Sequence, residues 1–172
     1  MTVYEVLDIV RTRPPMYLGD YRIHSLANLI AGMHWAGAED GGNPYRDFTS
    51  WYCFITNTQS SGPWAELEHQ LGDRQALEAF FSHLDRFRAC TLTPVETSTG
   101  PFHPRSMVTP VPAYLCIAQY CPTEAFILRD LSEVGDDLDE QFASKFFASA
   151  SAAREHALNK WAAPLTSWQR PS

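Results

Sequence analysis

The side chains that could catalyse a reaction or bind a metal are scattered along this 172-residue chain. Its six histidines form neither an HExxH motif nor a paired Cys/His ligand array. The chain also lacks a GxSxG nucleophile elbow, a GxGxxG loop and a P-loop. We therefore predict no catalytic residue, no metal site and no cofactor. An enzyme whose site is assembled from scattered His and carboxylate residues remains the alternative.

One acidic segment has the strongest local charge in the sequence. It holds six acids within eleven residues, and Arg129 is the basic residue beside it. A solvated loop is one interpretation, and a patch that attracts a cationic protein surface is the other. The spacing does not fit an EF-hand calcium loop. The six acids are Asp130, Glu133, Asp136, Asp137, Asp139 and Glu140.

The overall composition limits the partners that the chain can have. Its net charge of −7 argues against nucleic acid and against an anionic membrane surface, because both attract clustered Lys and Arg. No apolar run approaches the roughly 20 residues of a membrane span. The N-terminal residues do not resemble a secretion signal, and the four cysteines have no CxxC spacing. These features predict a cytoplasmic protein with reduced cysteines.

Apolar periodicity and turn residues divide the sequence into three parts. Residues 1–92 are predicted to form a helical module, with Thr2 and Glu5 as a capping box and an apolar stripe from Leu77 to Phe87. Residues 93–112 are rich in Pro and Thr and are predicted to be a linker or ordered loop. Residues 113–172 are predicted to form a small α+β lobe with a hairpin and a C-terminal helix. The fold class is therefore helix-rich α+β, with strand or helix left open over 124–134.

The segment "RTRPPMYLGD", residues 11–20, could be a ligand loop or a turn between helices. Its prolines should end the first helix, and Gly19 should let the chain reverse, with a positive φ. We predict a mainly structural role, in which Met16, Tyr17 and Leu18 are buried under the neighbouring helices. In the alternative, Arg11 or Arg13 faces a ligand or partner. The motif residues are Arg13, Pro14, Met16, Tyr17 and Gly19.

This segment resembles two groups of proteins. About ten residues are similar to the RPGMYIG segment of DNA gyrase B and related GHKL ATPases. In those ATPases the next helix carries a glutamate base and a magnesium-binding asparagine, whereas this chain has Leu29 and Met33 there. Neither side chain can do that chemistry, so the resemblance does not imply ATPase activity.

A second resemblance covers roughly the first 90 residues. This part of the chain contains, in order, an RPxMYLG segment, a Ser-Leu helix start, an aromatic "F..W" piece, a "GW"-like short helix and an "AL..FF..LD.F" helix. The same order is similar to that of a group of small bacterial proteins. Some members of this group are associated with polymorphic-toxin immunity. The resemblance implies a non-catalytic cytoplasmic immunity protein that binds and occludes a cognate bacterial toxin.

The partner implied is a toxin with a basic surface, and the oligomeric state is left open. The acidic segment would steer the encounter, and exposed aromatic residues would anchor the complex. The predicted anchors are Trp64, Trp161 and Trp168. The remaining alternative to an immunity protein or an enzyme is an oligomeric structural or regulatory module.

Overall fold

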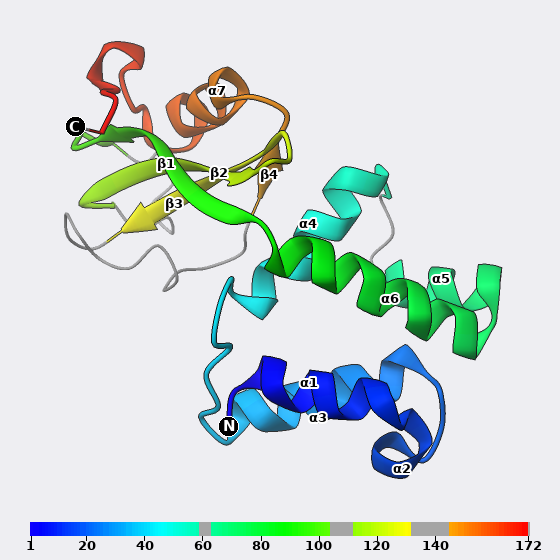
Figure 1. Cartoon of the computed structure of the whole chain (residues 1–172). Helices are drawn as coiled ribbons and strands as arrows, with labels where there is room; N and C mark the ends of the chain where they lie inside the picture. Colours follow the sequence, from blue (N-terminus) through cyan, green and yellow to red (C-terminus); the bar gives the residue numbers. More distant parts are fainter. Residues whose placement is uncertain (59–62, 104–111, 132–144, 172) are drawn as a thin grey trace. The chain divides into compact units, whose positions relative to one another are not determined.

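The computed structural model describes residues 1–58, 63–103, 112–131 and 145–171. The chain divides into two compact units, Met1–Ala89 and Cys90–Ser172 (Figure 1). Among the described residues, the first unit contains only helices, and the second combines a sheet with one α-helix. The predicted helix-rich α+β class is confirmed.

The first unit begins with α1 (Val3–Thr12), which has the capping box expected from its sequence. The Thr2 hydroxyl accepts the Glu5 amide at 3.2 Å, and the Glu5 carboxylate accepts the Thr2 amide at 2.7 Å. These bonds satisfy amides that an uncapped helix end would leave unpaired. The helix buries one face, formed by Val3, Tyr4, Leu7 and Val10.

Five further helices complete the first unit. They are α2 (Pro14–Leu18), α3 (Ile23–Trp35), α4 (Tyr45–Thr56), α5 (Pro63–Leu71) and α6 (Asp73–Arg88). Figure 1 shows α1 and α3 side by side, with α2 at the turn between them. The predicted stripe on α6 is buried, from Leu77 through Phe80, Phe81 and Leu84 to Phe87.

Stacked and edge-on aromatic rings fill the core between α4, α5 and α6. Phe48 is fully buried, and its ring centroid lies 5.3 Å from both Trp64 and Phe80 and 5.6 Å from Phe87. Such pairs add to the free energy of burial because the positive ring edges meet negative ring faces. The aromatic residues of three helices therefore form one core.

The second unit is built on an antiparallel sheet in the order β1-β2-β3-β4. The strands are β1 (Thr91–Ser98), β2 (Tyr114–Cys121), β3 (Ala125–Leu131) and β4 (Phe146–Phe147). The hairpin predicted for the third part of the chain is formed by β2 and β3, and residues 125–131 are a strand rather than a helix.

The linker predicted for residues 93–112 is wrong over its first six residues. Residues 93–98 belong to β1, and Thr91 and Leu92, which we had placed in the helical module, open the same strand. Pro94 misled the prediction because proline rarely occurs inside a sheet. Here β1 is an edge strand and its register shifts between Pro94 and Glu96, so the missing amide interrupts no regular ladder. Residues 104–111 lie outside the described part of the chain.

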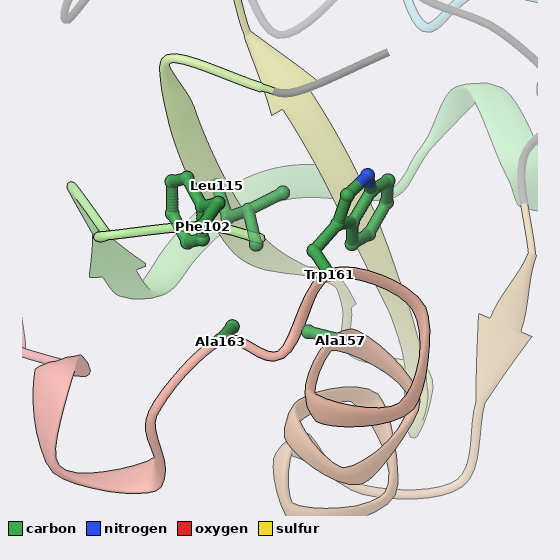
Figure 2. Close-up of a cluster of buried hydrophobic side chains, with 5 residues drawn as sticks. All are labelled: Phe102, Leu115, Ala157, Trp161 and Ala163. Atoms are coloured by element: carbon green, nitrogen blue, oxygen red, sulfur yellow. The ribbon is translucent and has the colours of Figure 1, made fainter. Parts of the chain in front are cut away.

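The helix α7 (Ala150–Trp161) packs against the sheet through small side chains. Its N-cap is Ser149, whose hydroxyl accepts the Ala152 amide at 3.1 Å. Ala153 and Ala157 are fully buried, which lets the helix approach the strands closely. Figure 2 shows the larger cluster, where Trp161 and Ala157 gather with Leu115, Phe102 and Ala163.

Cys53, Cys90, Cys116 and Cys121 are all free thiols. Burial raises the pKa of the Cys116 thiol to about 11, so this side chain is an inert thiol at neutral pH. Within the described residues, no helix has both the length and the apolar character needed to cross a bilayer.

Candidate functional site

The motif Arg13–Gly19 forms the short helix α2 rather than part of the core. Pro14 and Pro15 occupy its first positions, where a missing amide costs nothing because helix starts leave amides unpaired anyway. The predicted burial of Met16 and Tyr17 is wrong, since these side chains are 69% and 49% exposed. The short helix α2 buries none of its residues, so both side chains stay in contact with solvent.

The end of the motif turns the chain sharply towards α3. Gly19 has φ +80°, the left-handed conformation that we predicted for it. Asp20 then accepts the Arg22 amide at 2.9 Å and the Ser25 hydroxyl at 2.8 Å. These two hydrogen bonds, the backbone one first, hold the pKa of the Asp20 carboxyl below its ordinary value.

A cavity of about 560 Å³ lies where this motif faces α6. We call it the arginine pocket. The motif side contributes cationic, proline and methionine side chains, and the α6 side contributes two buried apolar residues with a charged pair. Its lining residues are Arg11, Thr12, Arg13, Pro14, Pro15, Met16, Tyr21, Arg74, Leu77, Glu78 and Phe81.

Two of the three arginines in the pocket are held in place by specific contacts. Arg11 donates to Asp85 at 2.7 Å, and its guanidinium carbon lies 5.4 Å from the centre of the Phe81 ring. Arg74 lies 5.7 Å from the centre of the Tyr21 ring and pairs with Glu78 at 3.4 Å. Cation–π contacts of this kind orient a guanidinium without using all of its donors.

Arg13 differs from the other two arginines. It is exposed and caps α1 through its backbone, and its amide donates to the Val10 carbonyl at 3.1 Å. Within the described residues, its guanidinium makes no ion pair, hydrogen bond or ring contact. The pocket therefore holds one cation that no described acid neutralises, beside two that are paired.

The groups whose ionisation is most altered lie elsewhere in the molecule. Burial raises the pKa of Tyr4 and Tyr45, and the nearby Asp40 carboxylate raises both further. Burial lowers the pKa of His83 and of His156. None of these four side chains lines the arginine pocket. The described residues also contain no group of three or more His, Cys, Asp or Glu side chains able to hold a metal ion.

The acidic segment predicted to bind a partner falls almost wholly outside the described residues. Glu133, Asp136, Asp137, Asp139 and Glu140 are in that undescribed part of the chain. Asp130 pairs through its backbone with Leu115 near the end of β3. The role of these six acids stays a prediction.

The three tryptophans predicted as anchors have unequal access to solvent. Trp161 is 3% exposed and belongs to the core of the second unit, so its assignment as a surface anchor is wrong. Trp64 and Trp168 are half-buried, the first against Phe48 and the second against the two core clusters around α7. Among the described residues, the most exposed large apolar side chain is Trp35, at 92%, which was not one of the predicted anchors.

No sequence pattern predicted the α6 side of the pocket. Arg74 and Glu78 are four residues apart and look like an ordinary exposed helix pair. Phe81 belongs to the core stripe and is 4% exposed. These residues follow the motif by about 60 positions, and only the packing of α6 on α1 brings them to it. Arg11 and Arg13 are the lining residues for which the sequence predicts a possible role in facing a ligand.

Comparisons with known proteins add no family to this description. No protein-family model matches the chain, and neither the curated proteins nor the solved structures include a significant match. A function for this chain must therefore be inferred from its residues and from the geometry of the pocket.

Proposed function

We propose that this protein is a non-catalytic binding protein, and that its first unit receives part of a partner in the arginine pocket. The single observation that carries the proposal is the pocket itself. It combines an unneutralised cation at Arg13 with apolar walls and an exposed Met16. Concave sites with apolar walls and a few placed polar groups are the usual form of binding sites.

The chemistry of the pocket favours binding over catalysis. Its one carboxylate, Glu78, is paired with Arg74 and is 69% exposed. A general base needs a carboxylate or imidazole that is free to accept a proton from a bound substrate. The pocket offers cationic and apolar contacts instead, and these recognise a ligand without transforming it.

We further propose that the binding is of the immunity type, in which the chain covers the active site of a cognate bacterial toxin in the cytoplasm. Two observations support this form of the proposal. The resemblance to immunity-associated proteins covers roughly the first 90 residues. The first compact unit, Met1–Ala89, contains the motif and all residues of the pocket.

The net charge of −7 suggests a toxin with a basic surface. We expect reversal of Asp136, Asp137 and Asp139 to Lys to slow association with such a toxin. The slowing should shrink as salt is added, because screening shortens the reach of surface charges. Stopped-flow association rates at low and high salt measure this effect. An unchanged rate at low salt would exclude a steering role for these acids.

The experiment that tests the proposed function has two stages. The tagged full chain is first used to recover bound proteins from the cells that produce it, and the bound species are identified by mass spectrometry. The purified partner is then assayed for toxic activity with increasing amounts of the chain. Immunity predicts full suppression at an equimolar ratio. Recovery of the chain alone, or a partner whose activity is unaffected, would contradict the proposal.

A matched pair of variants tests the location of the contact. Arg13→Gln removes the unneutralised charge from the pocket, whereas Arg46→Gln removes the same charge from an exposed position on α4 outside the pocket. We expect the first variant to weaken the complex and the second to leave it unchanged. Equal effects would place the contact elsewhere.

A further inference from the structure

We propose that the arginine pocket binds a single carboxylate carried by an apolar or aromatic group. The inference rests on the proposed function only for the source of that group, which would be an exposed side chain or chain end of the partner. The chemical match itself follows from the pocket and can be tested with small molecules.

The charge in the pocket selects an anion. Arg11 and Arg74 are each paired with a carboxylate, Asp85 and Glu78, at 2.7 and 3.4 Å. The guanidinium of Arg13 is left with its donors directed to solvent or to a ligand. A guanidinium presents a planar fork that matches the two oxygens of a carboxylate.

The walls of the pocket select the group that carries the charge. Leu77 and Phe81 are almost fully buried and form an apolar layer on α6, at 2% and 4% exposure. Pro14, Pro15 and Met16 face them from the motif, and the exposed Met16 side chain can adapt to an irregular apolar surface. A ligand with a flat or branched apolar body would bury the exposed surfaces of Met16 and Pro15 on binding.

The remaining acid in the pocket limits the charge of the ligand to one. Glu78 is paired with Arg74 at 3.4 Å, so the pocket offers one uncompensated positive charge, that of Arg13, and a second negative charge on the ligand would lie near Glu78 without a cation of its own. A phosphate monoester carries close to two charges at neutral pH, whereas a carboxylate carries one. One unneutralised arginine beside a resident carboxylate therefore favours the carboxylate over the phosphate.

The test uses the full chain and three small probes of similar size. Hydrocinnamate carries a carboxylate on an aromatic group, hydrocinnamamide is its neutral counterpart, and phenyl phosphate carries the higher charge. Their affinities are measured by NMR titration at pH 7.5 and low salt. We expect hydrocinnamate to bind about tenfold more tightly than the amide, since a charge-assisted hydrogen bond contributes roughly that factor. We expect phenyl phosphate to bind more weakly than hydrocinnamate.

Variants connect this binding to the named residues. Arg13→Gln should weaken hydrocinnamate about tenfold and leave the amide unchanged. The control Arg46→Gln removes an equal charge outside the pocket and should change neither affinity. Glu78→Gln should raise the affinity of the pocket for both hydrocinnamate and phenyl phosphate, because it removes the negative charge of Glu78. The increase should be larger for phenyl phosphate. Thermal unfolding of each variant checks that the fold is retained.

Several outcomes would overturn the inference. Equal affinity for hydrocinnamate and for hydrocinnamamide would show that the pocket has no anion site. Equal losses of hydrocinnamate affinity in Arg13→Gln and Arg46→Gln would show the same. Tighter binding of phenyl phosphate than of hydrocinnamate would overturn the assignment to a single carboxylate. A toxin neutralised by a chain that binds no probe would support immunity and refute this site. Binding of hydrocinnamate without any recovered toxin would support the carboxylate site and contradict the immunity function.

Discussion

The two units of this chain fill their cores in different ways. The first unit packs large aromatic rings against one another, with Phe48 in contact with Trp64, Phe80 and Phe87. In the second unit, α7 packs against the sheet through alanines, with Trp161 buried at the end of the helix. The first core should therefore be most sensitive to loss of volume, and the second to added volume.

The largest effect that we predict tests the aromatic core. Phe80→Ala should lower the free energy of unfolding by about 3–5 kcal/mol, because it removes a ring that packs on Phe48, Trp64 and Phe81. Urea unfolding followed by circular dichroism measures the loss. Hydrogen exchange by mass spectrometry should show it within residues 1–89.

The control for this prediction is Trp35→Ala, which removes an even larger ring from a side chain that is 92% exposed. We expect a change within about 0.5 kcal/mol for such a surface site. If Phe80→Ala opened residues 90–172 to the same degree, the two cores would not be independent, and the comparison between them would fail.

The next prediction tests the alanine contact of the second unit. Ala157→Leu should destabilise the protein by about 1–3 kcal/mol, because extra methylene groups must displace Leu115 or Trp161. Asn159→Leu places the same side chain at an exposed position of α7 and serves as the control. Urea midpoints compare the two variants, and equal midpoints would mean that α7 tolerates larger residues on its sheet-facing side.

A pair of glycines tests whether the motif is held by its turn. Gly19→Ala should cost about 1 kcal/mol, because Gly19 has φ +80° and alanine is strained there. Gly32→Ala within α3 should instead stabilise the protein by about 0.5–1 kcal/mol, since its Cβ would meet no atom within 4 Å. Melting temperatures should therefore move in opposite directions, and a shift of the same sign would show that the turn does not limit the motif.

The smallest predicted effect concerns pH and occurs in both units. Burial lowers the pKa of His83, which packs edge-on against Tyr52, and that of His156, which lies 5.3 Å from Phe147. A lowered histidine pKa means that the unfolded chain binds the proton first. Stability should therefore be fully present above the ordinary value of 6.5 and fall as the pH drops below it.

The variants His83→Gln and His156→Gln should flatten this pH dependence, each within its own unit. Hydrogen exchange at pH 7.5 and 5.5, corrected for the intrinsic exchange rates, measures the two slopes separately. An unchanged slope in both variants would assign the acid sensitivity to carboxylates instead.

Local signals in the sequence were sufficient for most of the helices and for the hairpin. The capping box of Thr2 and Glu5, the apolar stripe of α6 and the short apolar run of β2 act over a few residues, so they could be recognised without any tertiary contact. The strand β1 could not be recognised in this way. Its proline is tolerated only because it lies at a bulge on the sheet edge, which is a property of the assembled sheet.

The fold class, the turn at Gly19 and the two arginines that could face a ligand could all be predicted from the order of residues. The tertiary structure alone decided which side chains reach solvent, because exposure depends on what packs above a residue and not on its type. It buried Trp161, exposed Met16 and Trp35, and brought Arg74 and Phe81 to the motif. The arginine pocket therefore could not be read from the motif alone, since four of its eleven lining residues come from α6, about 60 residues further along the chain.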